Sequence, residues 1–405
     1  MDLQESSPLR KLPPELLLEI NECLDASALC SLRLSCKFHC ACTLHHFGKT
    51  YLNTIQSDLS LLSLQRMEYL TRNPRLCPYV HSLDIIGGNR DTLGIGLSWK
   101  RPASGLRLFL AQKPFQRLQN IILRLENCRS FRLHKHSWGS WTGPLSPFHG
   151  ITIILSIVAG LERPLRELSI LFKPLTSLCY TGIGQAMMTI SRVDKALLQD
   201  PKLIAACSTL EKFTFRQAVN TPDSVDFVMQ IIQHATRLQR LSIDADCANF
   251  SDILMSRLYS DQTVRALKLR ELRLKDIRAG SSEALNDFIA SFKHSLTSIS
   301  LAGIHLSSGT WPSLLRALAE FLPTRTQFST LYAGGWICFL LMRQDPLIPS
   351  HVHIVIDPAR GIKVPFSVSL LCGSWGISRL TYSGPRADIA LNALADGAPF
   401  VPGKG

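Results

Sequence analysis

The chain has 405 residues, of which 46% are hydrophobic and 19% are charged, and its formal net charge is +13. This length exceeds what one hydrophobic core normally supports, so we expect two units or an extended array of repeats. Twelve cysteines in so long a chain exclude a disulfide scaffold. No apolar run reaches the roughly 18 residues of a membrane-spanning helix. The first residues have no basic-then-apolar signal organisation, so we expect an intracellular protein, cytoplasmic or nuclear, with no membrane partner.

Residues 9–47 predict two or three short helices. A first helix is expected after the Leu12-Pro-Pro-Glu15 step, because proline suits the first turn of a helix. Two apolar stripes at helical period follow, separated by capping residues at 25–27; they are Leu16, Leu17, Ile20 and Leu24, and then Leu29, Leu32, Leu34 and Cys36. Helices this short cannot bury enough apolar surface to stand alone, so the segment must dock on its own domain or on a partner.

This spacing resembles the F-box: Leu-Pro, a Glu-Leu-Leu-x-x-Ile helix, an acidic turn and then Leu-x-x-Leu-Arg-x-x-Cys-Lys. Glu15, Leu17 and Asp25 belong to the match, although Phe38 follows Lys37 directly, earlier than the usual aromatic position of the family. The resemblance implies that the segment binds a Skp-type adaptor and, through it, a cullin ligase. The implied adaptor-binding residues are Leu12, Pro13, Leu16, Ile20, Leu24, Leu29, Leu32, Arg33, Cys36 and Lys37. The alternative is a helical cap on the larger domain.

From about residue 76 onward one pattern returns, with apolar residues at its first, fourth and sixth positions. Such alternation predicts a short half-buried strand, because successive side chains point to opposite faces of a sheet. Amphipathic helical spacing lies between the better copies, over 223–235, 281–292 and 310–322. The copies begin at Val80, Leu118, Leu123, Leu165, Leu210, Leu238, Leu269 and Leu296, with degenerate copies at Phe328 and Ile377.

The copies at 210, 238, 269 and 296 are 28, 31 and 27 residues apart, which is a strand-plus-helix period. The last two resemble leucine-rich repeats, although Ile277 and Ile304 replace the usual Asn or Cys after the strand. The resemblance implies a solenoid in which each unit buries its apolar face on its neighbours. The alternative is an ordinary α/β domain whose strands share this rhythm.

Two inserts, near 87–105 and 128–147, carry aromatic and arginine side chains of the types that anchor protein interfaces. Residues 98–140 contain nine lysines or arginines and one acidic residue, Glu126. This excess of positive charge favours acidic partners through electrostatic attraction. A nucleic-acid site there lacks any accompanying signature, and mobile loops without a partner are the other alternative. The candidate target-binding residues are Trp99, Arg101, Arg129, Arg132, Trp138 and Trp141.

We find no motif for catalysis or for a cofactor. Gly-x-Ser-x-Gly, the Walker lysine loop, His-Glu-x-x-His and Gly-x-Gly-x-x-Gly are all missing, so we expect neither an enzyme nor a bound cofactor. The cysteines and histidines of 36–46 could suggest zinc, but no Cys-x-x-Cys pair occurs and the cluster overlaps the F-box positions. His351 and His353 are interpreted as the polar side of a strand.

The predicted chain is therefore α/β. It has a short helical F-box over 1–50, a helical linker over 51–75, a leucine-rich-repeat-like strand/helix solenoid over 76–390 and a flexible tail over 391–405. The function that the two resemblances imply is recruitment of a protein substrate to an SCF-type (Skp adaptor, cullin, F-box) ubiquitin ligase, by proximity rather than by chemistry of its own. A repeat scaffold that binds a partner without ubiquitin-dependent degradation is the alternative, because both would share the same amino-terminal segment.

Overall fold

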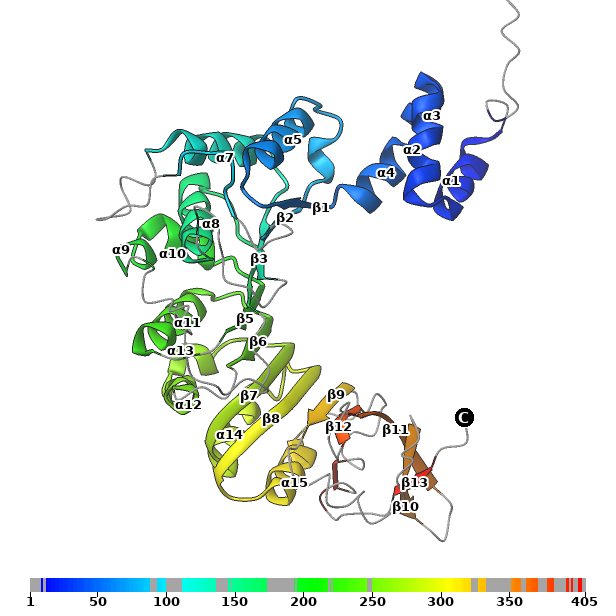
Figure 1. Cartoon of the computed structure of the whole chain (residues 1–405). Coiled ribbons are helices and arrows are strands. Elements are labelled where there is room, and N and C mark those ends of the chain that lie inside the picture. Colours follow the sequence, from blue (N-terminus) through cyan, green and yellow to red (C-terminus); the bar gives the residue numbers. More distant parts are fainter. Residues whose placement is uncertain are drawn as a thin grey trace, which may run out of the picture. The chain divides into compact units, whose positions relative to one another are not determined.

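The structure is a computed structural model. It describes residues 9, 12–87, 93–99, 111–135, 145, 147–172, 193, 195–217, 219, 221–245, 250–321, 327–332, 351–357, 362–370, 377–381, 391–392, 395 and 400–402. The chain divides into two compact units, each described by itself below (Figure 1). Unit 1 takes Met1–Arg132 and Gly139–Ser146, and unit 2 takes Leu133–Trp138 and Pro147–Gly405.

Unit 1 begins with four short helices, where the sequence predicted two or three. They are α1 (Pro14–Cys23), α2 (Ala26–Ser35), α3 (Lys37–Cys42) and α4 (Leu44–Tyr51), and we call them together the helical module. Proline occupies the first position of α1, as predicted. The Asp25 carboxylate accepts a hydrogen bond from the Ala28 backbone N–H at 2.7 Å, which starts α2.

The remainder of unit 1 contains a parallel strand pair, β1 (Thr54–Ser57) and β2 (Ser82–Ile86). Between them lie α5 (Leu61–Thr71) and the short 3-10 helix η2 (Cys77–Tyr79). The predicted helical linker over 51–75 is therefore wrong in part, because it contains a strand as well as α5. Ile55 pairs with Leu83 and Ser57 with Ile85, so a serine stands where the later copies have an apolar residue.

The predicted strands beginning at Leu118 and Leu123 are also wrong. Residues 118–123 lie within α7 (Lys113–Arg124). Its large buried side chains follow the period of a helix; they are Phe115, Leu118, Ile121 and Ile122. The strand comes later, as β3 (Ser130–Lys135), in which Phe131 and Leu133 are buried. The copy thus begins at Cys128, and the predicted insert over 128–147 starts with a strand that crosses the boundary between the units.

Unit 2 is an α/β arrangement in which successive strands lie side by side and parallel, and its helices lie on one side of these strands (Figure 1). The strands are β4 (Glu167–Phe172), β5 (Lys212–Arg216), β6 (Arg240–Asp244), β7 (Glu271–Ser281), β8 (Ser298–Ser308) and β9 (Gln327–Tyr332). The helices are α8 (Pro147–Leu161), α9 (Lys195–Leu198), α10 (Pro201–Cys207), α11 (Pro222–His234), α12 (Ser251–Ser260), α13 (Gln262–Arg265), α14 (Ser282–Ala290) and α15 (Trp311–Phe321). In the part of the chain that is described, none of the helices has both the length and the apolar character needed to cross a bilayer.

The predicted strand copies from Leu165 onward supply the core of unit 2. Their fourth positions pair laterally along the sheet, as do their sixth positions, and all of these residues are at most 1% exposed. Burying each such side chain contributes about 1.5–3 kcal/mol. The two rows are Leu168, Phe213, Leu241, Leu272 and Ile299, and then Ile170, Phe215, Ile243, Leu274 and Leu301.

The carboxyl-terminal strands run differently from the prediction. β10 (His351–Asp357), β11 (Ile362–Leu370) and β12 (Ile377–Thr381) pair with one another antiparallel, and β12 also pairs antiparallel with β9. The four residues between β10 and β11 explain this, because a parallel pair needs a crossover of about a dozen residues. The parallel array therefore ends at β9 rather than near 390. The predicted tail also contains β13 (Phe400–Pro402), which pairs with β10.

Candidate protein-docking site

The helical module has a small core of its own. Leu17 of α1 and Leu29 of α2 are buried, with exposed fractions of 4% and 0%. Asn21 lies one turn after Leu17 and is also buried, so these two residues mark the inward face of α1. Leu16 and Ile20, which the sequence placed on the same stripe, lie on the next row of the helix and remain exposed or half-exposed.

The module leaves large apolar side chains exposed on three of its helices. Leu34 of α2 is 87% exposed, and Leu16 and Leu18 of α1 are 44% and 43% exposed. Phe38 of α3 is 37% exposed. Single exposed leucines are ordinary on protein surfaces, but four large apolar side chains within the 23 residues from Leu16 to Phe38 mark a candidate docking site. We call Leu16, Leu18, Leu34 and Phe38 the exposed apolar set.

Arg33 points into the module. Its Nη1 atom donates to the Cys40 carbonyl at 3.3 Å and to the Thr43 hydroxyl at 3.1 Å. The guanidinium carbon also lies 4.2 Å from the centre of the Phe47 ring, a cation–π distance. Arg33 therefore joins α2 to α3 and α4, whereas the F-box resemblance implied that it binds the adaptor.

The ten predicted adaptor-binding residues separate into three groups. Pro13, Leu16 and Lys37 are exposed, and Leu12, Ile20, Leu24 and Leu32 are half-exposed. Leu29, Arg33 and Cys36 have contacts within the module; the Cys36 sulfur accepts the His39 backbone N–H at 3.4 Å and starts α3. Leu18, Leu34 and Phe38 were not among the predicted site residues. Leu34 had a signal in the sequence, because it belongs to the second apolar stripe, whereas Leu18 and Phe38 lie outside both stripes.

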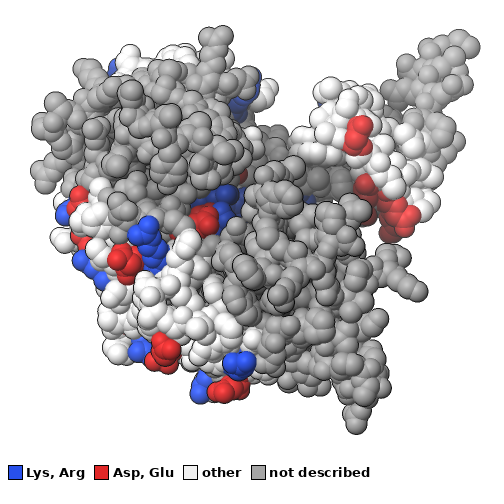
Figure 2. Space-filling model, turned by 60° about the horizontal axis from the view of Figure 1, so that its bottom comes forward, with Lys and Arg blue, Asp and Glu red and all other residues white. Residues whose placement is uncertain are grey.

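Acidic side chains accompany the exposed apolar set on α1. Glu15, Glu19 and Glu22 are exposed, and Asp25 follows at the start of α2. Figure 2 shows the acidic side chains of the helical module in red, on an otherwise mostly uncharged surface. A partner that contacts these residues would need apolar side chains bordered by basic ones.

The predicted target-binding residues do not form one surface in the described part of the chain. Trp99 is buried, with an exposed fraction of 6%, and it packs on the loop at Gly94, where a Cβ atom would lie 2.7 Å from its ring. Arg132 lies 4.0 Å from the Asp84 carboxylate, and Arg129 is exposed. Arg101, Trp138 and Trp141 lie outside the described residues.

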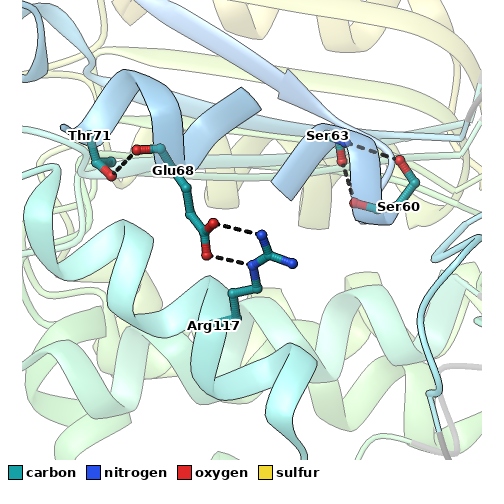
Figure 3. Close-up of polar contacts among 5 residues, drawn as sticks. All are labelled: Ser60, Ser63, Glu68, Thr71 and Arg117. Carbon is teal, nitrogen blue, oxygen red and sulfur yellow. Dashed lines mark hydrogen bonds and ion pairs between the residues drawn. The ribbon is translucent and has the colours of Figure 1, made fainter. Parts of the chain in front are cut away.

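Helices α5 and α7 of unit 1 are joined by a forked ion pair (Figure 3). The Arg117 guanidinium donates from Nε and Nη2 to the two carboxylate oxygens of Glu68, at 2.5 and 2.6 Å. These hydrogen bonds from Arg117 lower the pKa of Glu68 below its usual value, although partial burial opposes the shift. The Ser60 hydroxyl accepts the Ser63 backbone N–H at 3.2 Å and caps the start of α5.

This ion pair predicts an acid-dependent loss of stability. Because the pKa of Glu68 is lowered in the folded chain, its contribution is present above the ordinary carboxyl pKa and disappears as the pH falls through the folded pKa. We expect Glu68→Gln to lower the free energy of unfolding of unit 1 by about 0.5–1 kcal/mol near pH 7, with a smaller difference near pH 3. Urea midpoints at both pH values measure it, and an equal difference at both would contradict it.

Charged side chains on the strands of unit 2 pair across neighbouring strands. Lys212 of β5 lies 3.0 Å from the Glu167 carboxylate of β4, and Arg240 of β6 lies 3.1 Å from the Glu271 carboxylate of β7. Asp244 of β6 is buried, and Arg216 and Lys275 reach it from both sides at 3.0 and 3.1 Å. Each of these carboxylates has a cation on a neighbouring strand, although the two cations Lys212 and Arg240 also lie in register beside each other.

One open cleft of about 440 Å³ lies between α11 and α12 of unit 2. Its carboxylates already have partners, because Arg257 donates to Asp226 at 2.5 Å and Gln233 donates to Asp261 at 2.5 Å. Among the residues that the structure describes, no group of three or more His, Cys, Asp or Glu side chains is placed to hold a metal ion. In the suggested zinc cluster, His39 is buried and its Nδ1 atom lies 2.9 Å from the Ser35 hydroxyl.

Comparison with known proteins adds no assignment. The sequence matches no protein-family model and no curated protein.

Proposed function

We propose that this chain recruits a protein target to a ubiquitin ligase of the SCF type. In this proposal the helical module is an F-box that binds a Skp-type adaptor, and the remainder of the chain binds the target. The observation that carries it is the exposed apolar set, which lies on a module with its own core. A helical segment of about forty residues that leaves large leucines exposed gains most of its remaining apolar burial from a partner.

We propose further that the parallel part of the sheet is a leucine-rich-repeat-like array. Two observations support this: the strands β4 to β9 follow chain order, and equivalent apolar positions of β4 to β8 pair laterally. In such an array each repeat buries its apolar side chains on its neighbours. Its other residues are then free to vary with the target.

The adaptor assignment is tested by co-purification of the full chain with a Skp-type adaptor. We expect Leu16→Asp with Leu34→Asp to weaken capture at least about 100-fold, because two desolvated apolar anchors are replaced by charges. Both side chains are exposed, so the variant should fold. Leu62→Asp is the matched control, since Leu62 is 66% exposed on α5 and lies outside the module. Unchanged capture by the double variant would refute the proposed docking face.

The scaffold alternative uses the same docking face but delivers nothing for degradation. The two are separated by measuring protein half-lives after depletion of the chain. A set of proteins whose half-lives lengthen supports recruitment to a ligase. Unchanged half-lives, together with intact adaptor capture, would leave the scaffold as the function.

A further inference from the structure

The outward face of α5 combines exposed apolar and cationic side chains. Leu62 and Tyr69 are 66% and 77% exposed, and Arg66 is exposed between them. Because these residues are four and three positions apart, they lie on one face of the helix. The inward face carries the buried residues Leu64, Met67 and Thr71.

Ile95 extends this face beyond the first turn of the helix. The Leu61 backbone N–H donates to the Ile95 carbonyl at 3.0 Å, which places Ile95 at the first turn of α5, and its side chain is 49% exposed. The loop is held in place, since the Gly94 N–H donates to the Asp58 carbonyl at 2.8 Å. Gly94 has a φ of +80°, a conformation that glycine adopts without strain.

The charge of this face is basic. Arg66 lies on the helix, Arg72 follows its last residue and Arg75 lies in the turn beyond it; all three are exposed, and within the described residues none lies within 4.0 Å of a carboxylate. Glu68 is the acidic residue of α5, and its carboxylate is taken by Arg117 of α7. The described residues of this surface therefore attract carboxylates, and the Glu68 carboxylate does not compete because Arg117 binds it.

The face is also fixed before any partner arrives. The Ser60 cap holds the start of α5, and the forked Glu68–Arg117 pair holds its second half against α7 (Figure 3). A surface that is already ordered loses less conformational entropy on binding. Tyrosine and arginine are also the residue types that dominate binding energy at interfaces.

We propose that this face, which we call the α5 outer surface (Leu62, Arg66, Tyr69, Arg72, Arg75 and Ile95), binds an acidic protein segment that carries apolar side chains. The arginines match the carboxylates, and Leu62, Tyr69 and Ile95 match the apolar side chains. A protein segment supplies both, whereas a phosphate backbone would match the arginines and leave the aliphatic side chains without contacts. The assignment of this segment to the recruited target rests on the proposed function, but the binding itself does not.

The test is selection of random twelve-residue peptides displayed on phage against the full chain. We expect the retained peptides to combine Asp or Glu with Leu, Ile or Phe, and the best synthetic peptide to bind the Leu62→Ser, Tyr69→Ser double variant at least 10-fold more weakly. The control variant is Ile253→Ser with Arg237→Ser, both exposed in unit 2, which should bind like the parent. Recovery of no acidic peptide, or equal binding by the double variant, would overturn the proposal.

Charge reversal separates specific from non-specific attraction. The Arg66→Glu, Arg72→Glu double variant should no longer bind the acidic peptide. It should instead bind a form of the peptide in which lysine replaces each acidic residue. If the double serine variant instead loses a homopolymeric RNA or an anionic vesicle and keeps the peptide, a protein segment is the wrong occupant. None of these variants should change adaptor capture, whereas Leu16→Asp with Leu34→Asp should change adaptor capture and leave the peptide bound. The two proposals can therefore fail separately.

Discussion

Replacing Arg33 with alanine should unfold the helical module within an otherwise folded chain. The substitution removes hydrogen bonds from a charged donor to the Cys40 carbonyl and the Thr43 hydroxyl, and the contact with the Phe47 ring. Hydrogen bonds of charged groups contribute about 1.5–3 kcal/mol each, and a module this small has little stability to lose. We expect the amides of α2 to α4 to lose their protection in hydrogen exchange, and adaptor capture to fall with it.

Lys37→Ala is the matched control for this prediction, because Lys37 is exposed at the start of α3. It should leave hydrogen exchange of the module unchanged. Arg33→Lys should lie between the two, since lysine keeps the charge but not the planar fork. If Arg33→Ala leaves exchange unchanged and still abolishes capture, Arg33 contacts the adaptor directly, as the sequence resemblance implied.

Phe288→Ala should strongly destabilise unit 2. The Phe288 ring on α14 is 1% exposed, and its centre lies 5.4 Å from that of Tyr259 on α12 and 5.1 Å from that of Phe292. Removing a buried phenyl ring costs about 3–5 kcal/mol, through lost burial and the cavity that remains. We expect hydrogen exchange of the β7 and β8 amides to accelerate by the corresponding factor, roughly 100-fold or more.

Ile253→Ala provides the control on α12, because Ile253 is 42% exposed there. An exposed truncation of this kind should change stability by about 0.5 kcal/mol or less. Equal effects of the two substitutions would mean that α12 and α14 are not packed through Phe288. A loss confined to α14 amides, with β7 and β8 unaffected, would also contradict the prediction.

The strands of unit 2 could be predicted from the sequence where local pattern and long-range packing agree. At Leu210, Leu238, Leu269 and Leu296 the alternation is strict, and the structure has a strand at each. At Leu118 the apolar residues also fit the period of a helix, because Ile122 lies one helical turn after Leu118. The segment forms a helix rather than a strand. β1 was missed because Ser57 takes an apolar position, and no local signal shows that it pairs with Ile85.

The exposure of the candidate docking residues was predicted less well than the strands, for a physical reason. The exposure of a side chain depends on which other residues pack against it. The apolar stripe of a helix does not indicate how many of its side chains are buried by such contacts. Leu17 is covered and Leu16 is not, although both are leucines at adjacent positions. Arg33 matches the F-box motif in residue type. Its hydrogen-bond acceptors are the Cys40 carbonyl and the Thr43 hydroxyl, seven and ten residues further along the chain, and neither composition nor spacing indicates these contacts.

The ion pairs that Asp244 makes across β5, β6 and β7 restrict how this chain can change length during evolution. Deleting the strand–helix segment 238–268 would place β5 beside β7 and keep the apolar rows in line. Lys212 would then meet Glu271, but Arg216 would meet Lys275 after the loss of Asp244, the carboxylate that both now share. Loss of this segment would thus place Arg216 beside Lys275 without the carboxylate that they now share, although the apolar rows would still pair. The strand–helix segments are therefore not interchangeable, even though their apolar residues are equivalent.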